Sequence, residues 1–222
     1  MVKKSSFTYS KIGIYLVIFF AIWSIRELVI QPVFLDPLDD IISEILSTII
    51  KLSVWTLPAF LLIRHYHGDM WIGLREMFIT KPKWFKGALI FPLVMLIPLI
   101  QALIFAGEVT IRPDFVPIRL IGVVIFVGIT EEIVFRGFLL NTFLKRMKTW
   151  QAIAVDAILF YLIHIPIWLY QDNDFMFFLT AIPIVLVLSV FFAYSFIRTR
   201  NILVPIVLHM IWNLFNHILY FG

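Results

Sequence analysis

The stretch Thr130-Glu131-Glu132-Ile133-Val134-Phe135-Arg136 places two adjacent glutamates and an arginine inside the apolar segment 116–144. An unpaired charge at the centre of a membrane-spanning helix costs about 3 kcal/mol or more, so these three ionisable groups need a structural or chemical reason. Glu132 and Arg136 stand at i and i+4, and a helix therefore brings them together as an ion pair. Glu131 points about 100° away from its neighbour, so it needs another partner or a task of its own.

The composition predicts a membrane protein. Apolar residues make up 62% of the 222 residues and charged residues 14%, whereas soluble domains have about 45–50% and about 25%. The length leaves room for about seven spans of roughly 20 residues with short loops, and none for a separate soluble domain. We therefore predict an all-α, polytopic transmembrane helical bundle in which residues 1–222 form a single integral membrane domain. Because the chain has no cysteine, disulfides, thiolate zinc sites and a cysteine nucleophile are excluded.

Apolar runs separated by polar loops predict the individual spans. The first run follows a short basic segment, but it is long, contains Arg26 and Glu27, and lacks a small-residue cleavage site. We therefore expect an uncleaved span rather than a signal peptide. The polar stretch 64–86 carries apolar residues at helical spacing, which predicts either an amphipathic helix at the membrane surface or an irregular loop. The predicted spans are 12–30, 41–63, 87–106, 118–144, 150–170, 175–197 and 202–221.

Basic and acidic loops alternate along the chain. Clusters of lysine and arginine lie at the N-terminus and after the second, fourth and sixth spans, and acidic or mixed loops follow the first, third and fifth spans. The positive-inside rule then places the N-terminus in the cytoplasm and the C-terminus outside. The net charge of +4 therefore reflects orientation, and we expect the lipid bilayer, not nucleic acid, as a partner. The absence of an organelle signal fits a multi-pass protein of a prokaryotic plasma membrane.

Polar side chains in three of these spans are expected at a common depth. Glu131 and His164 each lie about 14 residues from the cytoplasmic end of their span, and Asn213 lies about 13 residues from it. His209 is one helical turn nearer the cytoplasm than Asn213 and on the same face. We therefore expect the four side chains to meet near the middle of the membrane.

Such a group of side chains suits hydrolysis. A carboxylate beside an imidazole can deprotonate a water and later protonate a leaving amine. A second histidine and an asparagine amide can donate hydrogen bonds to a developing oxyanion. Alternatively, the same residues could ligate zinc through nitrogen and oxygen and leave a position for water. Both alternatives lead to hydrolysis of an acyl bond, and the sequence contains no HExxH, Gly-x-Ser-x-Gly or Gly-x-Gly-Asp motif of other protease classes.

Three motifs in this region resemble those of a known family. In chain order they are Glu131-Glu132-x-x-x-Arg136, Phe160-x-x-x-His164 and His209-x-x-x-Asn213. The ordered trio resembles the CPBP family, the CAAX-protease and bacteriocin-processing family, also called Abi or type II CAAX prenyl endopeptidase-like. The resemblance covers residues 118–216 as a catalytic core and implies an intramembrane (metallo)endopeptidase.

The resemblance also implies roles for the motif residues. Glu131 and His164 would activate the attacking water, and His209 and Asn213 would form the oxyanion hole. No cofactor is certain, but zinc, if present, would be held by Glu131, His164 and His209. The implied substrate is a peptide or lipidated protein in the membrane, such as a bacteriocin leader, a signalling peptide or a lipid-tethered tail.

Five further polar or aromatic positions have supporting or open roles. Glu132 and Arg136 would brace the helices. Phe160 and Asp156 share a helix face with the motif histidine and are candidates for lining the cavity, although a structural polar contact is the simpler expectation for Asp156. Lys51 in the second span is expected to extend towards the interface or to pair with a neighbouring helix.

Two alternatives to a protease keep the same spans. A non-catalytic immunity or regulatory membrane protein could retain the fold and bind a partner, which would also fit a role in bacteriocin immunity. A small transporter could use the buried carboxylates as a proton relay. A purified protease would cleave peptides and lose that activity in Glu131→Gln, an immunity protein would keep its phenotype in that variant, and a transporter would show flux driven by a proton gradient.

Overall fold

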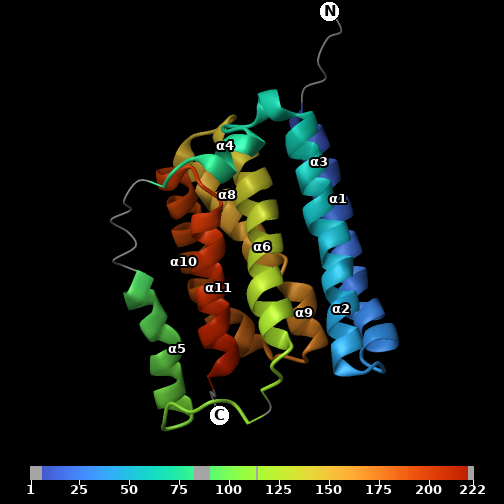
Figure 1. Ribbon diagram of the computed structural model, residues 1–222, viewed down its shortest axis with the longest axis vertical. Coiled ribbons are helices and arrows are strands. Elements are labelled where there is room, and N and C mark those ends of the chain that lie inside the picture. Colours follow the sequence, from blue (N-terminus) through green and yellow to red (C-terminus); the bar gives the residue numbers. More distant parts are fainter. Residues whose placement is uncertain (1–6, 83–90, 114, 220–222) are drawn as a thin grey trace, which may run out of the picture.

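The computed structural model describes residues 7–82, 91–113 and 115–219. Helices make up most of this part of the chain, which contains no strand and one isolated bridge between Ile111 and Leu219. The predicted all-α helical bundle is therefore confirmed. The described chain begins and ends at opposite ends of the bundle, because α1 starts at one end and α11 finishes at the other (Figure 1).

The N-terminal helices form two long rods that stand side by side at one edge of the bundle (Figure 1). The second rod starts at Asp39, whose carboxylate accepts a hydrogen bond from the Ile41 amide at 2.9 Å and so caps the helix. The first rod runs through Pro32 to Leu35 in a π-helical turn, so the first loop is shorter than the predicted 31–40. The segments are α1 (Tyr9–Ile25), η1 (Arg26–Leu35), α2 (Asp40–Lys51), η2 (Leu52–Thr56) and α3 (Leu57–His65).

The polar stretch after α3 does not form a long surface helix. It contains a short 3-10 turn, η3 (His67–Asp69), and one six-residue helix, α4 (Leu74–Ile79). The α4 side chain Met77 is buried against the bundle, and its carbonyl accepts a hydrogen bond from the Ile202 amide at 2.8 Å. The described part of this stretch therefore combines the two expected alternatives, with a short helix at α4 and turns or irregular loop around it. Of the predicted third span, α5 (Phe91–Phe105) is described, and residues 83–90 lie outside the described part.

The C-terminal half forms the rest of the bundle. The segment that carries the glutamates is helical from Leu120 to Leu144 and changes between α- and π-type hydrogen bonding along its length. The predicted fifth span is interrupted, because two helices meet at a break around His164. The segments are η5 (Leu120–Phe126), α6 (Val127–Glu132), η6 (Ile133–Leu140), α7 (Asn141–Leu144), α8 (Thr149–Leu162), α9 (Ile165–Tyr170), α10 (Phe175–Thr199) and α11 (Leu203–Ile218).

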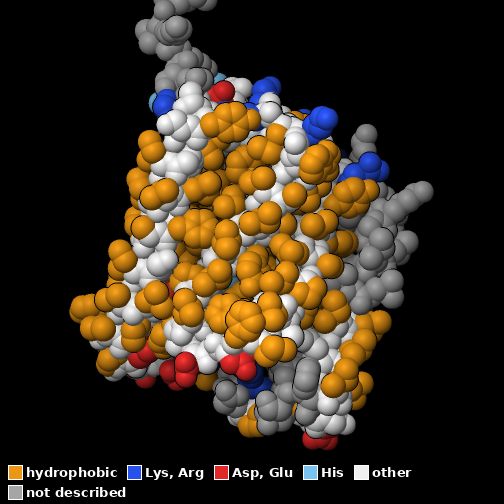
Figure 2. Space-filling view, turned by 180° about the vertical axis from the view of Figure 1, so that it is seen from behind, with side chains coloured by type: hydrophobic (Ala, Val, Ile, Leu, Met, Phe, Trp, Pro, Cys, Tyr) orange, Lys and Arg blue, Asp and Glu red, His pale blue; other side chains and the backbone are white. Residues whose placement is uncertain are grey.

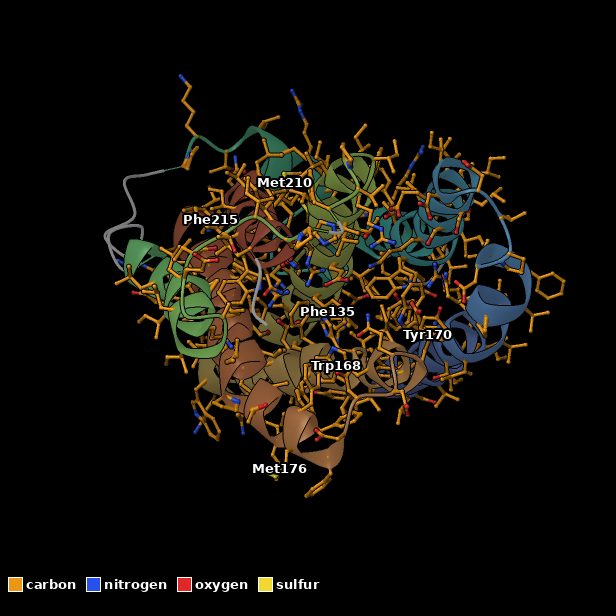
Figure 3. All side chains as sticks on the ribbon, turned by 90° about the horizontal axis from the view of Figure 1, so that it is seen from below. Phe135, Trp168, Tyr170, Met176, Met210 and Phe215 are labelled. Carbon is orange, nitrogen blue, oxygen red and sulfur yellow. The ribbon has the colours of Figure 1, made fainter. Side chains whose placement is uncertain are left out.

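The core of the bundle is aromatic and lies where η6 meets the N-terminal helices. Phe135 is fully buried, and its ring lies 6.0 Å from that of Trp55 and 4.9 Å from that of Phe160, both edge-on. Seen along the long axis, Phe135 lies inside the ring of helices and Met176 projects outwards (Figure 3). Packing of η6 against both halves of the chain therefore places the glutamates, one turn earlier, in the interior.

The outer surface is suited to lipid. Orange apolar side chains cover most of the face in Figure 2, with most of the visible lysine and arginine side chains at one end and most of the aspartate and glutamate side chains at the other. Four helices among the described residues are long and apolar enough to cross a bilayer: Tyr9–Leu35, Asp40–His65, Thr149–Tyr170 and Phe175–Thr199. The helix 120–144 carries three charges, and α11 is shorter, at 16 residues. The count of about seven spans remains a prediction.

Candidate active site

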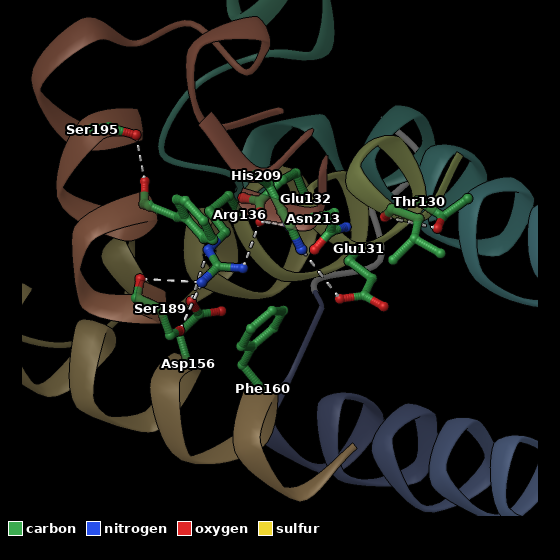
Figure 4. Close-up of polar contacts among 12 residues, drawn as sticks. Thr130, Glu131, Glu132, Arg136, Asp156, Phe160, Ser189, Ser195, His209 and Asn213 are labelled. Carbon is green, nitrogen blue, oxygen red and sulfur yellow. Dashed lines mark hydrogen bonds and ion pairs between the residues drawn. The ribbon is translucent and has the colours of Figure 1, made fainter. Parts of the chain in front are cut away.

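The two glutamates lie on α6 and are both buried, with Glu131 5% exposed and Glu132 fully enclosed. Helix α11 approaches α6 closely at Gly128, where an added Cβ would lie 3.0 Å from the Cγ of Met210. A glycine at this position therefore lets α11 bring its polar face next to the glutamates, one turn further along α6. Figure 4 shows the side chains of α6, η6, α8, α10 and α11 that converge there.

Glu131 divides its two carboxylate oxygens between two kinds of neighbour. Oε1 accepts a hydrogen bond from Lys51 Nζ at 2.7 Å. Oε2 is buried and has no hydrogen-bond partner among the described residues. It lies 3.9 Å from His164 Nε2 and 3.9 Å from His209 Nε2. One oxygen is therefore anchored, and the other faces two imidazole nitrogens across a gap too long for direct hydrogen bonds.

The break between α8 and α9 orients His164. The His164 amide donates to the Tyr161 carbonyl at 3.1 Å, which leaves the Phe160 carbonyl free of its usual helical partner. That carbonyl accepts a hydrogen bond from His164 Nδ1 at 2.6 Å. Because a carbonyl can only accept, Nδ1 carries the hydrogen, and Nε2 of the neutral ring presents a lone pair to Glu131.

Glu132 orients the second histidine. Its Oε1 accepts from His209 Nδ1 at 2.8 Å and from Arg136 Nη1 at 3.0 Å. The ring of His209 also stacks on Phe192, with centroids 5.0 Å apart. The hydrogen bond and the stacking together aim His209 Nε2 at Glu131. Glu132 is therefore more than a brace, because it also positions a residue of another helix.

Arg136 ties two further helices to the site. It forms the expected i,i+4 pair with Glu132, and its Nη2 donates to the Ser189 hydroxyl at 2.7 Å and carbonyl at 3.1 Å (Figure 4). Its Nε lies 3.5 Å from an Asp156 oxygen, and its guanidinium lies 4.4 Å from the centre of the Phe160 ring. These contacts join η6 to α8 and α10 with no exposure to solvent, which keeps α6 in place.

The remaining motif residues lie around this centre. The Asn213 amide donates one of its hydrogens to the Val123 carbonyl at 3.2 Å, so a second N–H of that amide remains for another acceptor. Phe160 is buried edge-on between the histidines, 4.9 Å from the ring of His164 and 5.9 Å from that of His209. Asp156 faces Arg136 rather than the histidines, as expected for a structural polar contact.

Two participants were not singled out as site residues from the sequence. Lys51 pairs with Glu131, which is the helix-pairing alternative given above for this lysine. Ser189 on α10 holds Arg136, and its only sequence signal was a hydroxyl inside a long apolar run. Neither partner could be assigned from local spacing, because both contacts join helices far apart in the chain.

The site fits a metal ion poorly. Its donor set of one carboxylate and two imidazoles is of a type that zinc accepts. However, a tetrahedral zinc holds its nitrogen and oxygen ligands about 3.3 Å apart, and the carboxylate–imidazole distances here are 3.9 Å. No group of three ligand side chains among the described residues has metal-binding geometry. The Lys51 ammonium at the same carboxylate also adds a positive charge that opposes a second cation.

Comparison with known protein families gives a match in the C-terminal half of the chain. Residues 113–215 match the family model described as type II CAAX prenyl endopeptidase Rce1-like, and this segment contains all three motifs. The resemblance to the CPBP family is thereby confirmed over this segment. No curated protein and no solved structure matches the chain.

Proposed function

We propose, from the premise that residues 113–215 form an Rce1-like domain, that this membrane protein is an intramembrane endopeptidase in which Glu131 and His164 activate the attacking water. One observation carries the proposal. Glu131 Oε2 and His164 Nε2, two acceptor atoms, face each other at 3.9 Å in a buried site, and His209 Nε2 lies 3.9 Å from the same carboxylate oxygen. Acceptors that face acceptors need a donor between them, and water is the simplest donor that can serve both.

The spacing suits a bound water. A water about 2.8 Å from each atom fits between two acceptors that are 3.9 Å apart, with one hydrogen directed at each. Glu131 can then take a proton as the water oxygen attacks the peptide carbonyl, and it can pass that proton to the leaving amine. His164 fixes the second hydrogen of the water through Nε2, because its Nδ1 is held by the Phe160 carbonyl.

The oxyanion of the tetrahedral intermediate would be stabilised from α11. His209 is directed into the site by Glu132, and an Nε2–H on this ring can donate to the oxyanion. The unassigned N–H of Asn213, one turn away on the same helix, supplies a second donor. Hydrogen bonds that stabilise the transition state more than the substrate lower the barrier, and removing one such donor typically costs about 100- to 1000-fold in kcat.

The substrate would be a peptide bond in a membrane-associated chain. The site lies on helices with lipid-facing apolar surfaces, and its carboxylate is almost fully buried. A leader peptide or a lipid-tethered tail could reach it from the bilayer. The charge distribution in Figure 2 supports an N-terminus in the cytoplasm of a plasma membrane, because the basic end of the bundle holds the start of α1.

The test compares cells that express wild type or Glu131→Gln at matched levels. Glutamine keeps the shape of the side chain but cannot take a proton, so we expect peptides made by the wild type to disappear. The readout is mass spectrometry of membrane-associated and secreted peptides, followed by cleavage of the identified substrate by purified protein.

Glu76→Gln is the matched control. Glu76 forms an exposed pair with Arg200 at 2.6 Å on the basic end of the molecule, so its replacement should leave the peptide profile unchanged. A Glu131→Gln profile identical to that of the wild type would refute the protease. Retention of a bacteriocin-immunity phenotype in the same variant would favour the non-catalytic alternative.

A further inference from the structure

Lys51 brings a positive charge to the proposed base from outside the matched segment. It is the last residue of α2, 80 positions before Glu131, and its Nζ lies 2.7 Å from Glu131 Oε1. The lysine side chain is 12% exposed. The site is therefore completed by a helix of the N-terminal half, which the family match at 113–215 does not include.

An aromatic pair holds the ammonium in place. Nζ lies 4.6 Å from the ring centre of Trp55 and 5.2 Å from that of Trp23. The two indoles are buried and meet edge-on with centroids 4.6 Å apart. A cation over the faces of desolvated indoles is attracted by the ring quadrupoles, so the lysine is kept inside the bundle instead of extending to the interface.

This arrangement separates two tasks on a single carboxylate. Oε1 is used by the ammonium, and rotation of the carboxylate is restricted because the ion pair joins α2 to α6. Oε2 is then aimed at the two imidazole nitrogens, each 3.9 Å away. The charge of Glu131 is also balanced inside an apolar environment, where an unpaired carboxylate would be costly.

We propose that Lys51 is a positioning residue, which holds Oε1 of Glu131 and thereby aims Oε2 at the reaction centre. The inference rests on the proposed function. It extends that function to a metal-independent reaction, because the Lys51 ammonium at this carboxylate opposes the binding of a second cation. The poor fit of the site to zinc supports the same conclusion.

The kinetic test uses the full-length protein and the substrate identified by mass spectrometry. We expect Lys51→Met to lower kcat by on the order of 100-fold with KM changed little, because a misaligned base slows chemistry more than binding. Lys51→Arg keeps the cation and should recover part of kcat. Lys11→Met is the matched control, since Lys11 also lies over an aromatic ring, 5.1 Å from the Tyr66 centroid, but at the other end of α1. Wild-type kcat in Lys51→Met would overturn the proposal.

A second test needs no activity. Thermal unfolding in detergent is measured for wild type, Lys51→Met, Glu131→Gln and the double variant. Lys51→Met leaves Glu131 without its cation, so we expect a lower Tm that rises again when Glu131→Gln is added. Additive losses of Tm would show that the two residues are not coupled and would overturn the inference. A coupled pair in a wild type that cleaves no peptide would instead refute the proposed function alone.

The metal itself is tested with zinc as the probe. Purified wild type incubated with zinc chloride and desalted should hold no stoichiometric zinc by elemental analysis, and a zinc chelator should leave its cleavage rate unchanged. Stoichiometric zinc whose removal abolishes cleavage would overturn the proposal.

Discussion

The adjacent glutamates have different tasks because consecutive helical residues point in different directions. Glu132 is shared by Arg136 on its own helix and His209 on α11, so its single charge serves both stability and orientation. Glu131 faces Lys51 and the space between the imidazoles. The spacing of the sequence alone predicted the Glu132–Arg136 pair, but it did not predict the hydrogen bond between Glu132 and His209.

Arg136→Met tests the buried network around this arginine. The variant leaves the carboxylates of Glu132 and Asp156 enclosed without the guanidinium, and breaking a buried pair in this way costs about 3–5 kcal/mol in the free energy of unfolding. Chemical unfolding in detergent micelles measures the loss. Arg198→Met is the control, because that guanidinium is exposed and lies over the Tyr194 ring. Equal stability of the two variants would contradict the structural role of Arg136.

The distance between α6 and α11 decides whether the catalytic groups meet. Gly128 makes the close contact described above, and its neighbours on α11 are the Met210 side chain and backbone and the Ile206 carbonyl. Two of these neighbours are backbone atoms of α11, which cannot move aside for a new side chain unless the helix itself moves. A side chain that extends beyond Cβ at this position would meet the α11 backbone and push α11, and with it His209, away from α6.

Gly128→Leu should therefore reduce peptide cleavage by on the order of 100-fold, because a displacement of about 1 Å is enough to misalign catalytic groups. Gly13→Leu is the matched control, since nothing lies within 4 Å of a Cβ at Gly13 on α1. Cleavage rates of the two variants, normalised to the folded protein measured by gel filtration, give the comparison. Equal rates would show that the close packing of α6 on α11 is not required.

The molecule as a whole is polarised between a basic and an acidic end, and the two halves of the chain meet at Glu131. The N-terminal rods carry Lys51 and the aromatic pair Trp23 and Trp55, and the C-terminal helices carry the motifs. The positive-inside rule then orients the complete bundle rather than any single helix.

This orientation can be tested by labelling, because the natural chain has no cysteine. Asp40→Cys lies at the acidic end and Lys145→Cys at the basic end, both at exposed positions. We expect a membrane-impermeant maleimide to label Asp40→Cys in intact cells and Lys145→Cys only after permeabilisation. The unsubstituted protein is the control for background, and the reverse pattern would invert the predicted topology.

Local features of the sequence were enough to predict the helical bundle and the Glu132–Arg136 pair. The common depth of the motif residues in the membrane stays a prediction. Apolar runs must be buried or lipid-facing, and helical spacing fixes which neighbours on one helix can meet. The convergence of Glu131, His164 and His209 followed from depth, but its distances did not. Only the packing of the helices determined the ion pair between Lys51 and Glu131 and the hydrogen bond between His209 and Glu132. Both join different helices, and their geometry depends on how closely those helices approach and on where α8 breaks.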